Sequence, residues 1–234
     1  MLPVAILAGG LATRLYPTTK TIPKALVKVA GKPFIKHQLE FLKLQKITQV
    51  VLCVGHLGEM VMDVIGNGDE FGIHVSYSYD GDNPLGTGGA LKKALHLLED
   101  NFYILYGDSF LPICFSTVND AYVNNDKSGL MTVLYNSNKW DKSNVLFNNN
   151  QILEYNKHQP NPYMRHIDYG LAVVSKRIFD HYKANITFDL AEVYHQLSMV
   201  GQLAGFEVHE RFYEIGSHTG LKETEEYFLT KEKT

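Results

Sequence analysis

The sequence predicts an α/β fold with a mostly parallel β-sheet. Two short apolar runs, at 4–8 and 49–54, are typical of buried strands, and residues 73–79 alternate in polarity like a third strand. Helical segments follow the first two strands, one from residue 33 and a short one at 60–65. A chain in which strands and helices alternate builds a parallel sheet with right-handed crossovers.

Local signals support the individual elements of this first half. The first strand ends at the glycine pair Gly9-Gly10. In the following helix, Ile35, Leu39 and Leu42 recur at helical spacing and form one apolar face. The second strand and the short helix after it each stop at glycine, which breaks both kinds of structure.

A further helix and strand follow the third strand. Thr87 is placed to cap a helix whose apolar face contains Leu91, Ala94 and Leu98. Residues 102–106 form a fourth strand. The prediction is therefore a sheet of at least four strands before residue 110.

The second half of the chain is less regular, but no linker or repeat divides it from the first. Asp189, with Glu192 three residues later, resembles a capping box at a helix start. We expect strands at 130–135, 166–174 and 202–208, a hairpin of 144–147 and 151–155, and a last helix at about 217–230. The prediction is one domain, 1–234, with two lobes.

Composition excludes several classes of protein. The 234 residues carry a formal net charge of −3, which gives no general attraction to nucleic acid. Cys53 and Cys114 are far apart in apolar surroundings, so we expect buried, reduced thiols. The histidines and cysteines show no zinc-binding spacing. The chain starts directly with a strand and contains no membrane span, so we expect a cytoplasmic protein that does not bind membranes.

The loop after the first strand has the chemistry of a polyphosphate site. Gly9 and Gly10 leave backbone N–H groups bare, and such groups bind anions. Arg14 and Lys24 add two cations nearby. Ligands of open α/β sheets bind at this carboxyl end of the strands. The spacing matches neither the P-loop nor the dinucleotide fingerprint, and the alternative is a plain glycine turn with two surface cations.

Two further loops carry weaker signals. The sequence NPLGTGGA at 83–90 would let a flat base approach the backbone at Gly86 and Gly88, although a helix cap alone would also explain it. Asp108 follows Gly107 at the end of the fourth strand and suits a hard cation such as Mg²⁺, or else it caps the next turn. Glu214 precedes a glycine at the end of a short strand and has the same two interpretations.

At this point the chain resembles a known family. LAGGxxTRLxP followed by PKAL is similar to the signature of nucleotidyltransferases that make nucleotide sugars from a nucleoside triphosphate and a sugar 1-phosphate. LGTGGA, YGD and YEIG follow in the family's order. The usual form has glycine where this chain has Ala12. The resemblance implies a Rossmann-like three-layer α/β/α sandwich with a mostly parallel mixed sheet, a nucleotide-binding lobe of about 1–110 and an acceptor-binding lobe of about 111–234.

The resemblance also implies residue roles. Arg14 and Lys24 would be catalytic, and Asp108 and Glu214 would hold Mg²⁺, although the family usually has Asp or Asn at the position of Glu214. Nucleotide binding would use Leu7, Ala8, Gly9, Gly10, Thr13, Gly86, Thr87 and Gly88. Sugar binding would use Asn144, Glu154, Lys157, Asp168 and Gly170.

The implied reaction condenses a nucleoside triphosphate with a sugar 1-phosphate, for surface polysaccharide biosynthesis. Short members that use GTP and a heptose 1-phosphate look similar, and UTP or dTTP remain open. A cytidylyltransferase for a non-sugar acceptor such as phosphocholine is one alternative, with Tyr155, Tyr163 and Tyr169 as candidates for an aromatic cage. The other is a non-catalytic nucleotide-sugar sensor. Neither the base, the sugar nor a homo-oligomeric state follows from the sequence.

Overall fold

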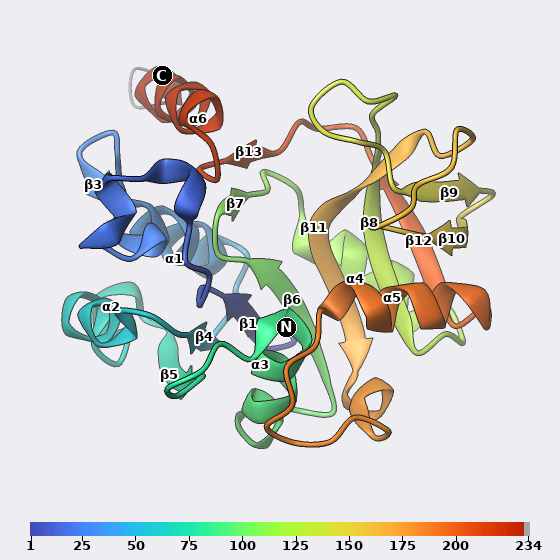
Figure 1. The fold of residues 1–234 in the computed structure, drawn as a ribbon, viewed down its shortest axis with the longest axis horizontal. Coiled ribbons are helices and arrows are strands. Elements are labelled where there is room, and N and C mark those ends of the chain that lie inside the picture. The colour runs from blue at the N-terminus through green and yellow to red at the C-terminus, as the bar shows by residue number, and fades with distance from the viewer. Residues whose placement is uncertain (232–234) are drawn as a thin grey trace.

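The computed structural model describes residues 1–231, and within that range nine strands form one mixed sheet (Figure 1). The strand order is β5-β4-β1-β6-β11-β8-β12-β10-β9. Four strands run parallel in the first half: β1 (Val4–Leu7), β4 (Gln49–Val54), β5 (His74–Tyr79) and β6 (Asn101–Tyr106). The predicted α/β fold with a parallel sheet is confirmed for this half.

The second half of the sheet mixes strand directions. The long strand β11 (His166–Ser175) is antiparallel to β6 and also to β8 (Gly129–Tyr135). Beyond them, β12 (Leu203–Val208) runs parallel to β8. The predicted hairpin is present at the far edge as β9 (Val145–Asn148) and β10 (Gln151–Tyr155). The sheet is therefore mixed, as predicted.

Helices cover both faces of the sheet and make three layers. One face carries α1 (Phe34–Leu44), α2 (Gly58–Ile65) and α4 (Phe115–Val123), whose buried side chains share one core cluster. The other face carries α3 (Gly86–Ala94) and α5 (Leu190–Met199), which share a second cluster. In Figure 1, α5 crosses in front of β8 and β12 while α4 lies behind them.

The helix α4 was not among the predicted elements. Its sequence, FSTVNDAYV, contains β-branched residues and Asn, which have low helix propensity. Phe115 and Val118 are fully buried against the sheet. Tertiary packing therefore stabilises this helix where local preference is weak.

The last helix, α6 (His218–Lys231), closes the molecule over the first lobe. Phe228 packs with Phe34, Phe110 and Ile215 in a third cluster. Two short strands, β7 (Ser109–Phe110) and β13 (Tyr213–Glu214), pair antiparallel. A second short pair joins β2 (Lys28–Val29) to β3 (Lys32–Pro33). The β7–β13 pair carries the C-terminal segment back to the end of β6.

Two local predictions were wrong. Thr87 does not cap α3, because it lies inside that helix and Leu85 occupies the N-cap position. Cys114 is exposed rather than buried, since it lies at the start of α4, where its thiol contacts the Ser116 hydroxyl. Cys53 is buried, as expected. Asp189 does cap α5, with its side chain accepting from the Ala191 N–H.

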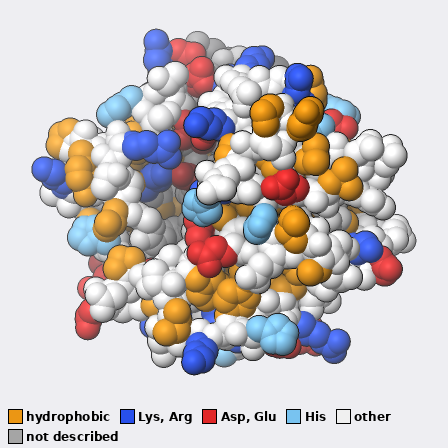
Figure 2. Space-filling model, turned by 45° about the vertical axis from the view of Figure 1, so that its right-hand side comes forward, with side chains coloured by type: hydrophobic (Ala, Val, Ile, Leu, Met, Phe, Trp, Pro, Cys, Tyr) orange, Lys and Arg blue, Asp and Glu red, His pale blue; other side chains and the backbone are white. Residues whose placement is uncertain are grey.

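The surface has mixed character. On the face shown in Figure 2, hydrophobic side chains lie among charged side chains and histidines. None of the helices within residues 1–231 combines the length and the apolar character that crossing a bilayer requires.

Candidate active site

A pocket of about 260 Å³ opens at the carboxyl ends of β1, β4 and β6. This is the edge where the parallel strands end and where the sequence predicted the polyphosphate site. The pocket brings together the glycine loop, the start of α3 and the turn after β6. It is lined by Leu7, Ala8, Gly9, Gly10, Leu11, Lys24, Ala25, Cys53, Asp80, Pro84, Gly86, Thr87, Ala90, Tyr106, Gly107 and Asp108.

Two glycines let the strand ends pack closely beneath this pocket. A Cβ at Gly9 would lie 3.2 Å from the Gly55 backbone nitrogen, and one at Gly107 would lie 2.7 Å from the Leu7 carbonyl oxygen. At Gly10, by contrast, a Cβ would meet nothing within 4 Å. The backbone at Gly10 is therefore open to a ligand, whereas the absence of a side chain at Gly9 lets the strand ends pack closely.

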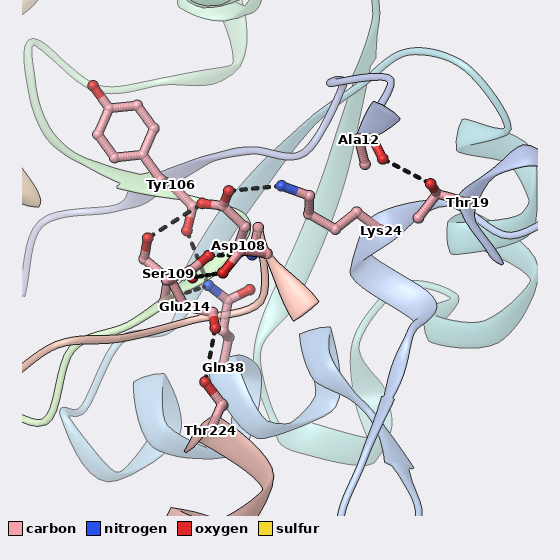
Figure 3. A network of polar contacts seen from close by, with 11 residues as sticks. Ala12, Thr19, Lys24, Gln38, Tyr106, Asp108, Ser109, Glu214 and Thr224 are labelled. Atoms are coloured by element: carbon pink, nitrogen blue, oxygen red, sulfur yellow. Dashed lines mark hydrogen bonds and ion pairs between the residues drawn. The ribbon is translucent and has the colours of Figure 1, made fainter. Parts of the chain in front are cut away.

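Lys24 and Asp108, which both line the pocket, form an ion pair (Figure 3). The Lys24 Nζ lies 2.8 Å from Asp108 Oδ2, and both side chains are partly buried. The Ser109 hydroxyl donates to Asp108 Oδ1 at 3.2 Å. Lys24 comes from a single helical turn after Pro23, and Asp108 from the turn after β6. Residues 84 positions apart in sequence thus meet at one point.

Gln38 of α1 holds the turn that carries Asp108. Its Nε2 donates to the Tyr106 carbonyl at 3.1 Å and to the Ser109 carbonyl at 2.8 Å (Figure 3). Gln38 is buried, and its Oε1 has no hydrogen-bond partner within the part of the chain that the structure describes. Sequence reasoning missed this contact, because Gln38 occurs in an ordinary amphipathic helix with no local motif.

Arg14 and Glu214 reach the same place from opposite ends of the chain. A Cβ built on Gly216 would lie 3.2 Å from Arg14 Nη2, 3.2 Å from Asp108 Oδ2 and 2.7 Å from Glu214 Oε2. Within residues 1–231, Arg14 makes no ion pair with a carboxylate, so its charge is available to an anionic ligand.

Glu214 is held by local donors. Its carboxylate accepts from the Gly216 N–H and, at 2.6 Å, from the Ser217 hydroxyl, and its carbonyl accepts from Thr224 Oγ1 at 2.9 Å. The β7–β13 register places Glu214 opposite Ser109, next to Asp108. The described residues contain no group of three or more His, Cys, Asp or Glu that would hold a metal ion. A cation at this point would therefore have two protein carboxylates at most and would need ligand oxygens as well.

Three of the predicted sugar-binding residues lie together. Asn144 Oδ1 accepts from the Asp168 N–H at 3.0 Å, and the Gly170 N–H donates to Asp168 Oδ1 at 3.0 Å. Gly170 has a φ of 108° where the β11–β8 register shifts, a conformation that favours glycine. Asn144, Asp168 and Gly170 thus form one polar cluster on β11 and the segment before β9.

Tyr106 joins this cluster to the pocket. Its hydroxyl donates to Asp168 Oδ2 at 3.4 Å, while the residue also lines the pocket beside Asp108. Burial raises the pKa of Asp168 to about 6, against hydrogen bonds from Gly170 and Tyr106 and the charge of Lys157, which lower it. Sequence reasoning assigned no role to Tyr106, although it immediately precedes the Gly-Asp pair.

The remaining two predicted sugar-binding residues contact different partners. Glu154 accepts from the Asn156 side chain at 3.2 Å and from the Asn161 side chain at 3.0 Å, within its own loop. Lys157 instead forms an ion pair with Asp189, at 2.8 Å. The part of Glu154 and Lys157 in sugar binding therefore stays a prediction.

Two of the predicted nucleotide-binding residues do not line the pocket. Thr13 is exposed in a helical turn after the glycine loop. Gly88 is buried, and a Cβ there would overlap the ring of Phe188. The structure thus gives Gly88 a packing role, and the part of both residues in nucleotide binding stays a prediction.

Asp80 is a pocket residue that sequence reasoning missed. It follows β5 directly, and its Oδ2 accepts from the Leu85 N–H at 3.3 Å. Burial raises the pKa of Asp80, opposed by that hydrogen bond and by Lys93. A carboxylate at the end of a predicted strand was the available signal, because a carboxylate in the turn after a strand also identified Asp108.

The three tyrosines proposed for a choline cage do not gather around one space. Tyr155 and Tyr169 are both buried, but they belong to core clusters on opposite faces of the sheet. Tyr163 is 78% exposed. An aromatic cage needs its rings around one cation, so this arrangement does not support a choline site.

Comparison with known proteins identifies the family. Residues 4–144 match the family model described as nucleotidyl transferase, and the chain belongs to this family. A curated relative, D-glycero-alpha-D-manno-heptose 1-phosphate guanylyltransferase of Campylobacter jejuni, is 42% identical over 109 residues, or 46% of this chain and 48% of that protein. The chain thus spans about half the length of this relative.

Other relatives act on different substrates. Mannose-1-phosphate guanyltransferase beta-A of Xenopus laevis is 28% identical over 90% of this chain and 60% of that protein. UTP–glucose-1-phosphate uridylyltransferase of a Synechocystis strain is 30% identical over 55% of this chain and 36% of that protein.

Solved structures agree on the fold. HddC from Yersinia pseudotuberculosis, complexed with GMP-PN, superposes with a TM-score of 0.83 at 23% identity, over 97% of this chain and 100% of that one. The inositol-1-phosphate CTP transferase of T. maritima has a TM-score of 0.78 at 21% identity, over 97% and 95%. The predicted Rossmann-like α/β architecture is therefore confirmed.

Proposed function

We propose that this chain transfers a nucleotidyl group from a nucleoside triphosphate to a sugar 1-phosphate, releasing pyrophosphate. The observation that carries the proposal is the convergence of Lys24, Asp108 and Arg14 at the mouth of a pocket bordered by Gly9 and Gly10. Exposed backbone N–H groups at the glycines and the two cationic side chains suit a polyphosphate. The Asp108 carboxylate suits the divalent cation that accompanies a polyphosphate. Relatives that make nucleotide sugars support the same class of reaction.

The chemistry needs charge stabilisation and positioning. A phosphate oxygen of the sugar 1-phosphate attacks the α-phosphorus, a new P–O bond forms, and the bond to pyrophosphate breaks with its electron pair on the departing oxygen. The attacking phosphate is already ionised at neutral pH, so no general base is required. Lys24 would sit between the α-phosphate and the acceptor phosphate, and Arg14 would stabilise charge on the leaving pyrophosphate.

A divalent cation fits the donor set and is part of the proposal. Asp108 would hold Mg²⁺, with Glu214 as the second carboxylate, because both oxygens flank the position of Gly216. Bound Mg²⁺ neutralises phosphate charge. Lys24, which already contacts Asp108, would keep that carboxylate oriented toward the nucleotide. Both oxygens of Glu214 accept hydrogen bonds from the start of α6, which fixes the direction of its carboxylate.

Guanine is the base we favour. Asp80 supplies a carboxylate inside the pocket. A carboxylate can accept from both the N1–H and the exocyclic amine of guanine, whereas uracil and thymine offer one N–H between two carbonyl groups. Asp80 therefore favours GTP over UTP and dTTP, in line with the guanylyltransferases among the relatives.

A heptose 1-phosphate is the acceptor we favour, on the strength of the Campylobacter jejuni relative. Asn144, Asp168 and Gly170 form the polar cluster that would read sugar hydroxyls, next to the pocket at Tyr106. Buried polar groups of this kind discriminate strongly against a ligand that leaves them unpaired. The product would serve surface polysaccharide biosynthesis in the cytoplasm.

Pyrophosphate release tests the proposal. The purified chain is incubated with Mg²⁺ and each of ATP, GTP, CTP, UTP and dTTP, crossed with a panel of hexose and heptose 1-phosphates and with phosphocholine. We expect release with GTP and a heptose 1-phosphate. Release only with phosphocholine would show that the acceptor is not a sugar 1-phosphate. No release with any substrate pair, together with tight binding of a nucleotide sugar, would favour a non-catalytic nucleotide-sugar sensor.

A further inference from the structure

A chain of polar contacts links the two lobes beside the pocket, and it runs through Asp189. On one side, Thr87 Oγ1 donates to Asp189 Oδ1 at 2.7 Å. On the other side, Lys157 Nζ donates to Asp189 Oδ2 at 2.8 Å. Thr87 lines the nucleotide pocket, whereas Lys157 follows β10 in the acceptor lobe. One carboxylate therefore contacts a group from each half of the chain.

The nucleotide side of this connection is held by several hydrogen bonds. Thr87 Oγ1 also accepts from the Leu190 N–H at 2.8 Å, so its hydroxyl acts both as a hydrogen-bond donor and as an acceptor. Around it, the Gly88 N–H donates to the Phe188 carbonyl at 3.0 Å and the Phe188 N–H donates to the Leu85 carbonyl at 3.1 Å. Backbone hydrogen bonds thus fasten the start of α3 to the start of α5.

The acceptor side of this connection is more exposed to solvent. The side chains of Lys157 and Asp189 are 51% and 32% exposed, and such a pair contributes only about 0–1 kcal/mol to stability. The ammonium has three donors, and the contact with Asp189 uses one of them. Its charge also acts on Asp168, which belongs to the predicted sugar cluster. Lys157 is therefore placed to bind an anionic acceptor while Asp189 holds it.

We propose that Asp189 is a positioning residue that couples the nucleotide pocket to the acceptor site through Thr87 and Lys157. The inference rests on the proposed function and extends it. A nucleotide that orders Thr87 and the start of α3 also orders Asp189, and Asp189 then holds Lys157 where the phosphate of the acceptor would bind. The two substrates would accordingly bind with positive coupling, because the first one bears part of the ordering cost of the second.

Asp189→Asn tests this inference with little damage to the helix. Asn is as good an N-cap as Asp, so α5 keeps its cap and the bond with Thr87, but the charge that holds Lys157 is lost. Glu70→Gln is the matched control, because it removes the carboxylate of another Lys pair, Lys36–Glu70 at 2.8 Å, whose residues do not line the pocket. Lys157→Met removes the same contact from its other end.

Hydrogen–deuterium exchange gives a readout that does not depend on turnover. The nucleotide probe is whichever of the five common triphosphates raises the melting temperature of the wild-type protein most. We expect this nucleotide to slow exchange in residues 156–162 of the wild type and of Glu70→Gln, and to leave exchange there unchanged in Asp189→Asn. Equal protection in Asp189→Asn would overturn the coupling alone. A wild-type chain that binds none of the five would overturn the coupling and the proposed function together.

Kinetics provides the second test once a substrate pair is known. We expect Asp189→Asn to raise the KM for the acceptor about 5-fold, with the KM for the nucleotide unchanged, which is the lower end of usual coupling between sites. In the double variant with Lys157→Met, the effect of Asp189→Asn should disappear, because the group it positions is gone. Additive effects of the two substitutions would contradict the inference.

Discussion

The two lobes differ in how their site residues come together. In the lobe proposed to bind the nucleotide, the strands are parallel with unbroken register, and Gly9, Asp80 and Asp108 each lie in the turn just after a strand. In the acceptor lobe, the register shifts in the β9–β10 and β11–β8 pairs, and the polar residues come from separate segments. A regular sheet edge thus defines the first site, whereas bulges and contacts between loops define the second.

This difference predicts that the largest effect on turnover comes from the nucleotide lobe. Replacing Asp108 by Asn should lower kcat about 10²–10³-fold, the scale seen when a preorganised charge-stabilising group is lost. The fold should persist, because the amide can still accept from Ser109. The measurement is the initial rate of pyrophosphate release at saturating substrates.

Asp126→Asn is the control for that substitution, because Asp126 is 90% exposed and forms an ion pair with its neighbour Lys127. Wild-type rates in Asp108→Asn would contradict the role of Asp108 as a metal ligand. They would also contradict the proposal that residues of this lobe stabilise the phosphate charge during transfer.

The contact between the lobes should be sensitive to volume. Gly88→Ala would force its new methyl group into the ring of Phe188, so we expect a loss of about 2 kcal/mol in the free energy of unfolding. Gly10→Ala is the matched control, because a Cβ there meets nothing within 4 Å. Urea unfolding of both variants measures the difference. Equal stabilities would mean that the two lobes are less tightly packed at this contact than the structure indicates.

The acceptor lobe should show a pH-dependent effect at Asp168. Burial raises the pKa of this carboxyl from 3.8 to about 6, so the folded state binds this proton more tightly than the unfolded state does. The stability gained from that protonation is complete below about pH 3.8 and is lost as the pH rises through about 6. Asp168→Asn should therefore stabilise the protein by about 1–2 kcal/mol at pH 8 and very little at pH 4.

Unfolding by urea at the two pH values tests this. The same variant should bind the sugar 1-phosphate less well, because the charged acceptor of hydroxyl groups is gone. A gain in stability at pH 4 as large as at pH 8 would show that the charge of Asp168 is not the cause.

The smallest effect is expected in the glycine loop itself. Ala12 has a φ of 50° and a ψ of 43°, a left-handed conformation that costs a residue with a Cβ about 1 kcal/mol. Ala12→Gly removes this strain but gives the unfolded chain more freedom, so we expect a gain of at most about 0.5 kcal/mol. A thermal melt compares it with the wild type, and a clear loss of stability would show that the Ala12 methyl group makes a contact that matters.

Much of the nucleotide lobe was predictable because its signals are local. A glycine or a carboxylate directly after an apolar run identifies a strand end, and parallel strands place their ends at one edge of the sheet. Asp80 was missed although it follows the same rule. Gln38 and Tyr106 were not predictable, because their roles depend on carbonyl and carboxylate groups that the chain brings to them from far away.

In the second lobe, the strands and helices were predicted better than the contacts between the candidate sugar-binding residues. The hairpin, β11 and the Asp189 cap were found from pattern and turn chemistry. Lys157 was predicted as a sugar-binding residue, but its contact with Asp189, which is 32 positions away in sequence, was not predicted. The helix α4 was missed, because packing determines it and local preference does not.

Product analysis by phosphorus NMR distinguishes nucleotidyl transfer to a sugar 1-phosphate from hydrolysis of the nucleotide. The productive substrate pair is mixed with Mg²⁺ and the wild-type chain, and all phosphorus-containing products are quantified over time. Nucleotidyl transfer predicts pyrophosphate and a nucleoside diphosphate sugar in equal amounts, with the α-phosphate of the nucleotide retained in the sugar product. Pyrophosphate accompanied by nucleoside monophosphate would instead show hydrolysis, and would contradict transfer to an acceptor held by the second lobe.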